Sequence, residues 1–157
     1  MLIQFQSYLT FETIYLWSNF GVLPFWFMLI FIPNSRITQI FINSVILPLI
    51  LAVAYVYIIY QTILLEEPIT GIFKLYLSLD DLYTIFATEN FLLLFWLHFL
   101  ALNLFLGSWV SRDGVKHGMS RSLIFIPLIL IYFTGPIGLV LHWLIRVFYA
   151  RQLKFHD

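Results

Sequence analysis

The sequence contains no cysteine and few charged residues. None of its 157 residues is Cys, and only 10% are Asp, Glu, Lys or Arg. The lack of cysteine excludes disulfides, thiolate metal ligands and cysteine nucleophiles. The formal net charge is zero, so the chain has no excess of basic residues to attract the phosphates of a nucleic acid. These absences exclude a disulfide scaffold and a nucleic-acid-binding protein.

Apolar residues make up most of what is present. Hydrophobic residues account for 62% of the chain and aromatic residues for 20%, whereas soluble domains are about 45–50% apolar. A chain of this length cannot bury that much apolar surface in a core of its own, because small domains leave a large fraction of their surface exposed. The composition predicts an integral membrane protein that forms a single domain over residues 1–157.

Four uncharged stretches are long enough to cross a membrane. A hydrocarbon core about 30 Å thick needs roughly 20 apolar residues of helix. The stretches are continuously apolar, unlike the alternating segments of a β-barrel. They predict an all-α fold, a four-helix transmembrane bundle. We expect the spans over about 13–33, 39–63, 90–110 and 122–145.

The segment between the second and third predicted spans has a different composition. Residues 68–89 mix apolar and aromatic side chains with Lys74, Asp80, Asp81 and Glu89. This density of charge is too high for a span. It favours an amphipathic segment that lies in the membrane interface, with its aromatic side chains toward the lipid.

The basic residues do not decide the orientation of these four spans. Four Lys and Arg fall on the side of the first and third connections, and four on the other side, so the positive-inside rule gives a tie. The acidic residues lie mostly on the second side, although they weigh little in this rule. We expect the first and third connections to lie inside.

Polar residues within the apolar spans are the first candidates for function, because they are costly to place in lipid. His98 and Asn103 fall in the third span, and His142 falls near the end of the fourth. In two antiparallel spans the two histidines would differ in depth by roughly 7 Å. We therefore expect both imidazoles to reach one cavity. The alternatives are hydrogen bonds between helices and, for His142, anchoring at the interface.

Several chemistries lack the residues that they need. With four histidines in the chain, a membrane di-iron centre is excluded and we expect no metal. No glycine-rich phosphate loop is present, and no elbow motif to hold a nucleophilic serine. We expect no cofactor, although a haem held by two histidines stays open as an alternative.

Several motifs together resemble a known family, the plant abscisic-acid-deficient (neoxanthin synthase) family. The resemblance runs from about residue 20 to 146, and the order and spacing of the motifs make it specific. The motifs are VLPFWFM at 22–28, IPN at 32–34, WLHFLALNLF at 96–105, DGVK at 113–116, and GPIGL at 135–139 with His142 after it.

The resemblance implies a small multispan membrane protein. Plant members are plastid proteins needed to convert violaxanthin into neoxanthin, which turns an epoxide end-group into an allenic alcohol. This isomerisation needs an acid and a base in a dry slot, but no metal or nicotinamide. The expected catalytic residues are His98 and its partner His142, since an unperturbed imidazole has a pKa of about 6.5. The expected substrate-binding residues are Trp26, Phe95, Trp96, Phe99, Asn103 and Asp113.

One departure from the family pattern leaves a second function open. The family usually has an acid where this chain has Asn103. The chain is therefore expected to be either a carotenoid or terpenoid isomerase, or a non-enzymatic pigment-binding or accessory membrane subunit. The expected partners are membrane lipid, a carotenoid or other apolar substrate, and a second copy or a partner membrane enzyme. Because no transit segment precedes the first span, we expect a bacterial cytoplasmic membrane.

Overall fold

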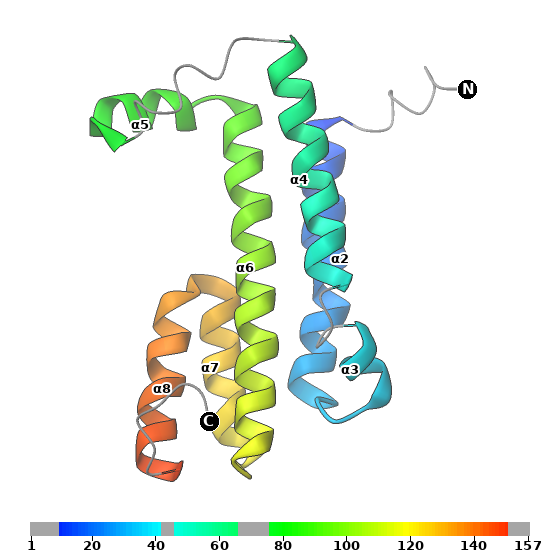
Figure 1. Cartoon of the computed structure of the whole chain (residues 1–157), viewed down its shortest axis with the longest axis vertical. Helices are drawn as coiled ribbons and strands as arrows, with labels where there is room; N and C mark the ends of the chain where they lie inside the picture. Colours follow the sequence, from blue (N-terminus) through cyan, green and yellow to red (C-terminus); the bar gives the residue numbers. More distant parts are fainter. Residues whose placement is uncertain (1–9, 42–45, 66–75, 151–157) are drawn as a thin grey trace.

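The computed structural model describes residues 10–41, 46–65 and 76–150, and every element in these ranges is a helix (Figure 1). The all-α prediction is confirmed. Part of the predicted interfacial segment, residues 68–75, lies outside the described residues. The helices are α2 (Phe11–Phe31), α3 (Arg36–Phe41), α4 (Ile46–Leu65), α5 (Leu79–Phe86), α6 (Glu89–Lys116), α7 (Arg121–Thr134) and α8 (Pro136–Ala150).

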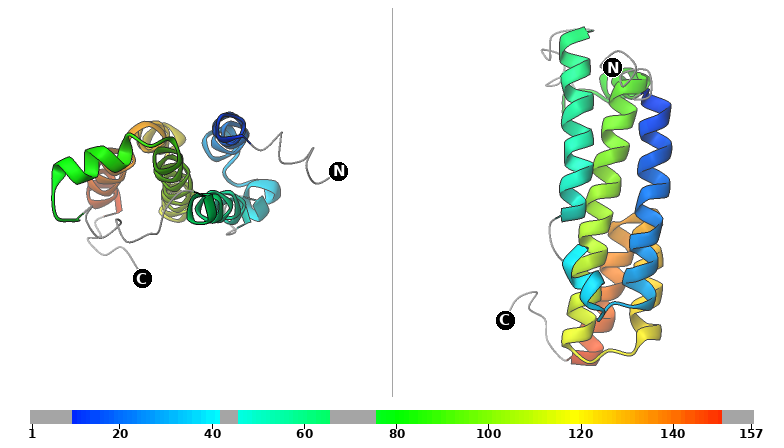
Figure 2. Two further views of the ribbon diagram at one scale, coloured as in Figure 1. Left: turned by 90° about the horizontal axis from the view of Figure 1, so that it is seen from above. Right: turned by 90° about the vertical axis from the view of Figure 1, so that its right-hand side faces the viewer.

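The long helix α6 is the centre of the molecule. Its 28 residues extend for about 42 Å. Helix α4 packs along its first half, α7 and α8 pack against its second half, and α2 lies along it and reaches α7 (Figure 1). Figure 2 shows the same arrangement from above and from the side. Every other long helix therefore takes its position from α6.

Side-chain caps mark where α2 and α5 begin. The side chain of Thr10 accepts a hydrogen bond from the backbone N–H of Thr13 at the start of α2. Ser78 does the same for the N–H of Asp81 at the start of α5. Asp80 and Asp81 lie in the first turn of α5, where carboxylates complement the helix dipole. Helix α5 runs across the end of α6 rather than along it (Figure 1).

The fourth predicted span is not one helix. The range 122–145 is divided at Gly135 into α7 and α8, which fold back on each other (Figure 1). Gly135 has a φ of +64°, a backbone conformation that residues with a Cβ rarely adopt. Gly138 allows the close approach of the two helices, since a Cβ there would collide with Ile131 and with the carbonyl of Pro127. The expectation of a continuous helix is therefore wrong, and an αα-hairpin takes its place.

The surface of the helices is apolar. Large hydrophobic side chains are exposed on α2, α4, α6, α7 and α8, among them Trp17, Phe20, Val53 and Phe133. Exposed apolar surface of this extent is typical of a face that contacts lipid or another protein. Within the described ranges, α2 and α6 are the helices long and apolar enough to cross a membrane, while α7, α8 and the apolar stretch Pro48–Thr62 of α4 are shorter. The four-span bundle stays a prediction.

Candidate functional site

The most buried polar pair of the structure joins α6 to α8. Nε2 of His142 lies 2.9 Å from Oδ2 of Asp113, and the His142 side chain is 0% exposed. A carboxylate can only accept hydrogen bonds, so Nε2 carries the proton and donates it. The two residues are 29 positions apart in the sequence. They meet because the hairpin returns α8 to the C-terminal end of α6.

A buried arginine completes the cluster. Arg146 lies one turn after His142, on the same face of α8. Its Nε is 3.1 Å from Oδ2 of Asp113, and its side chain is 1% exposed. A buried charge is tolerated only when an opposite charge lies next to it. Arg146 and Asp113 therefore compensate each other's charge inside the protein.

A second imidazole extends the cluster toward the end of α6. Nδ1 of His117 lies 2.9 Å from the backbone oxygen of Asp113 and 3.6 Å from Oδ1 of its carboxylate. His117 follows the last residue of α6. Asp113 therefore has a histidine on each of its two carboxylate oxygens, one deeply buried and one at the helix end.

The second ring nitrogen of His142 is buried. Among the residues that the structure describes, none forms a hydrogen bond with Nδ1 of His142. Because Nε2 carries the proton, Nδ1 of the neutral ring has a lone pair. The indole of Trp109 packs edge-on against the ring, with 5.7 Å between centroids. The arrangement is that of a base that is oriented by a carboxylate and shielded by an aromatic side chain.

Asn103 lies at the other end of the hairpin. Its side chain is buried, and its Oδ1 would be 2.5 Å from a Cβ built on Gly135. Ten residues separate Asn103 from Asp113 along α6, which corresponds to about 15 Å. Asn103 therefore supports the turn between α7 and α8 and does not contact the ionic cluster.

The structure does not bring His98 and His142 together. His98 is exposed, and its ring lies 6.4 Å from that of Tyr55 on α4. Fifteen residues of α6 separate it from Asp113, about 22 Å along the helix. The expectation of one shared cavity is wrong, because α8 folds back toward the end of α6 instead of passing His98. The same separation excludes a haem held by these two histidines of one chain.

The predicted aromatic residues fall into two places. Trp96 donates from Nε1 to Oδ1 of Asn19 at 3.0 Å and stacks on Phe99. Phe95 contacts Phe86 of α5, with 5.0 Å between the ring centroids. These three residues lie on the first half of α6, on the side of the molecule where α5 lies. Their role as a substrate slot stays a prediction.

Trp26 lies elsewhere, in an apolar groove between α2 and α7. Its buried indole packs edge-on against Tyr132 and against Gly107 of α6. The groove has a volume of about 270 Å³, and its other lining residues are all apolar or aromatic. It can hold part of an apolar molecule but offers no acid or base.

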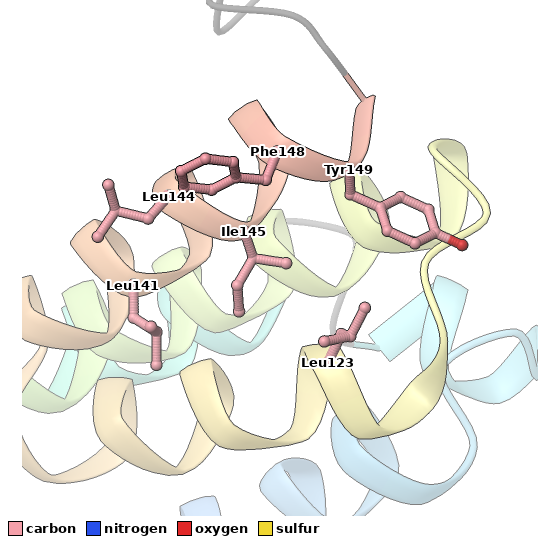
Figure 3. A pocket seen from close by; sticks show the side chains of 6 residues that line it. All are labelled: Leu123, Leu141, Leu144, Ile145, Phe148 and Tyr149. Atoms are coloured by element: carbon pink, nitrogen blue, oxygen red, sulfur yellow. The ribbon is translucent and has the colours of Figure 1, made fainter.

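A second groove lies on the hairpin itself. It has a volume of about 430 Å³ and is lined by Leu123 of α7 and by Leu141, Leu144, Ile145, Phe148 and Tyr149 of α8 (Figure 3). Leu141 and Ile145 neighbour His142 and Arg146 in the sequence. The groove therefore borders the face of α8 that carries the ionic cluster.

Arg146, His117 and Trp109 are the site residues that sequence reasoning missed. Arg146 was expected in the chain beyond the last span, and Trp109 within a span of many aromatic residues. The spacing of His142 and Arg146, four residues apart in a helix, was the available signal. Across the described ranges, no group of three or more His, Cys, Asp or Glu is arranged to hold a metal ion.

Two comparisons with known proteins give matches to the chain. The family model described as ABA DEFICIENT 4-like matches residues 13–142, which include Asn103, Asp113 and His142 but not Arg146. The chain is 29% identical over 143 residues to the chloroplastic protein ABA DEFICIENT 4 of Arabidopsis thaliana, and the match covers 85% of the chain.

The chain spans 60% of the length of that relative. The relative's name places it in the chloroplast, so the comparison gives no support to a bacterial cytoplasmic membrane. No solved structure matches the chain.

Proposed function

We propose that this chain, which belongs to the ABA DEFICIENT 4-like family, is a membrane protein that isomerises a carotenoid or a related apolar terpenoid by acid–base chemistry. The observation that carries the proposal is the 2.9 Å contact between Nε2 of His142 and the Asp113 carboxylate. It leaves the other nitrogen of a buried imidazole able to take up a proton.

The proposed reaction uses His142 as both base and acid. Nδ1 removes a proton from the polyene carbon next to the epoxide ring, the electron pair of that C–H bond forms the second double bond of the allene, and the adjacent epoxide C–O bond opens. The proton then passes to the epoxide oxygen, which becomes the alcohol. Nothing is oxidised or reduced. Asp113 stabilises the imidazolium that exists between the two proton transfers, as an aspartate does beside a catalytic histidine.

The cluster has the environment that such a step requires. Charges act more strongly in a buried site than in water, and Trp109 and α8 exclude water from His142. The imidazole is fully enclosed, so substrate reaches Nδ1 when the side chains over the ring move. The groove on α8 is lined by apolar side chains and Tyr149, which suits a long hydrocarbon chain.

Conversion of violaxanthin in detergent tests the proposal. The purified protein is incubated with violaxanthin, and neoxanthin is measured by chromatography. We expect His142→Gln to reduce the rate at least about a hundredfold, the lower end for acid–base catalysis. His98→Gln is the matched control, since His98 lies about 22 Å from the cluster along α6. An unchanged rate in His142→Gln, with wild-type folding, would clear His142 of a chemical role.

A second candidate function is pigment binding without catalysis, in an accessory subunit that supplies another membrane enzyme. The groove between α2 and α7 favours it, because this groove is lined by apolar and aromatic side chains and holds no acid or base. A visible spectrum with the three-fingered band of a bound polyene, together with no product from violaxanthin, would support this function over the first.

A further inference from the structure

Within the described residues, the hairpin of α7 and α8 is shorter than a bilayer is thick. The described parts of the helices have 14 and 15 residues, about 21 and 22 Å each, against a hydrocarbon core of about 30 Å. Both outer ends of the hairpin lie at the C-terminal end of α6. The hydroxyl of Tyr149 in α8 donates to the carbonyl of Gly118, just after α6, at 3.2 Å.

The turn of the hairpin lies level with the middle of α6. Gly135 packs against Asn103, and Asn103 is halfway along the range Glu89–Lys116. If α6 crosses the bilayer, the turn is therefore near mid-depth. The side chains on either side of it, Phe133 and Ile137, are exposed and apolar.

The backbone of the turn is suited to a medium without water. The N–H of Gly135 donates to the carbonyl of Ile131 at 2.9 Å, and its own carbonyl accepts from the N–H of Leu139 at 3.2 Å. Pro136 has no N–H to satisfy. Irregular backbone at membrane depth is tolerated where its polar groups are satisfied and buried in protein. Gly135 meets both conditions, since it is itself buried.

The charges of the described residues are divided between the two ends of the bundle. Helix α3, the start of α7 and the end of α8 lie toward the C-terminal end of α6 (Figure 1). With the last turns of α6, these elements hold all five basic residues of the described ranges: Arg36, Arg112, Lys116, Arg121 and Arg146. The start of α2 and α5 lie toward the opposite end (Figure 1), and with the start of α6 they hold four of the five acidic residues: Glu12, Asp80, Asp81 and Glu89. The even division expected from the sequence required residues 122–145 to cross the membrane. The hairpin moves Arg146 to the basic end.

We infer that α2, α4 and α6 cross the membrane, and that α7 and α8 form a re-entrant hairpin that enters and leaves on the basic side. By the positive-inside rule, that side is the cytoplasm or the matrix of an organelle. The ionic cluster of Asp113, His142 and Arg146 then lies toward this side, below the point where the hairpin turns. The inference rests on helix lengths, contacts and charge, and is independent of the proposed reaction.

The absence of cysteine from the chain makes a labelling experiment direct. Single-cysteine variants are made at three exposed positions: Glu89→Cys at the start of α6, Ser120→Cys before α7, and Phe148→Cys near the end of α8. The full chain is expressed in bacterial cells, and a membrane-impermeant maleimide is applied to spheroplasts before and after lysis. Variants are compared only when they express and migrate as the wild type does.

The pattern of maleimide reactivity distinguishes a re-entrant hairpin from a fourth span. Glu89→Cys should react in intact spheroplasts, whereas Ser120→Cys and Phe148→Cys should react at least tenfold more after lysis. Reaction of positions 120 and 148 from opposite sides would overturn the hairpin and restore a fourth span. Reaction of both from outside, with position 89 protected, would overturn the orientation.

A distance measurement tests the hairpin without depending on which side of the membrane a reagent can reach. Spin labels are attached to the double variant Ser120→Cys/Phe148→Cys in detergent and in lipid. A continuous helix would separate the two positions by about 42 Å. The hairpin predicts a much shorter distance, because the Tyr149 side chain reaches Gly118. A distance near the longer value in lipid would overturn the inference.

Discussion

The two halves of α6 have different surroundings although both are apolar in sequence. Residues 89–102 pack with α4, and the histidine in this half, His98, is exposed and has its ring near that of Tyr55. Residues 103–116 are covered by the hairpin and bury Asn103, Ser108, Ser111 and Asp113. Polar chemistry is therefore concentrated where the chain folds back on itself. A histidine in an apolar helix indicates a site only when a second element covers it.

The largest effect is expected from removing the Asp113 carboxylate in the second half of α6. Asp113→Asn leaves the Arg146 guanidinium buried without its counter-charge, which destabilises a protein by about 3–5 kcal/mol. Thermal unfolding in detergent, followed by circular dichroism, measures the loss. Glu12→Gln, at an exposed position of α2, is the matched control and should change stability by no more than about 0.5 kcal/mol. Equal melting temperatures for the two variants would show that the cluster contributes nothing to folding.

A smaller effect is expected at the turn of the hairpin. Gly135→Ala forces a Cβ into a positive φ, a cost of about 1–2 kcal/mol, and places it 2.5 Å from Oδ1 of Asn103. Gly118→Ala is the matched control, since Gly118 has the same φ with no atom within 4 Å of the added Cβ. The excess of the first variant over the second, about 1–3 kcal/mol, should disappear in an Asn103→Ala background. An excess that persists would mean that Asn103 does not support the turn.

Packing between α2 and the second half of α6 can be tested in the same way. A Cβ on Gly107 would lie 2.7 Å from the indole of Trp26, so Gly107→Ala should destabilise by about 1–3 kcal/mol. Gly21→Ala meets no atom within 4 Å and should be neutral or stabilising by up to about 1 kcal/mol. Chemical denaturation in mixed micelles compares the two. A destabilised Gly21→Ala would show that the helix faces are assigned incorrectly.

The smallest effect is expected in the first half of α6. His98→Gln should leave stability within about 0.5 kcal/mol and any conversion of violaxanthin within twofold, because His98 is exposed and distant from Asp113. Parallel assays of melting temperature and product formation check both values. A large loss of activity with intact stability would return His98 to the catalytic role first expected of it, and would place the reaction between α4 and α6.

The sequence was sufficient to predict the helices but not the hairpin. Uninterrupted apolar runs identify helices in lipid, and the all-α class followed from them. The reversal at Gly135 and Pro136 was missed because membrane helices tolerate proline within a continuous span. The position of His142 depends on that reversal. Asp113 could therefore be predicted as a site residue, but its contact with His142 could not. Gly138, three residues after the turn, was the remaining clue to close helix packing.

The indole of Trp26 connects three helices, since it belongs to α2, packs on Gly107 of α6, and lies 5.4 Å from the ring of Tyr132 on α7. Light absorbed by Tyr132 can pass to the indole over so short a separation. The emission of this tryptophan consequently reports whether α7 is seated. Detachment of the hairpin, by substrate or by mutation, would then be visible as a change in the wavelength and intensity of emission from a variant that keeps Trp26 as the only one of the chain's five tryptophans.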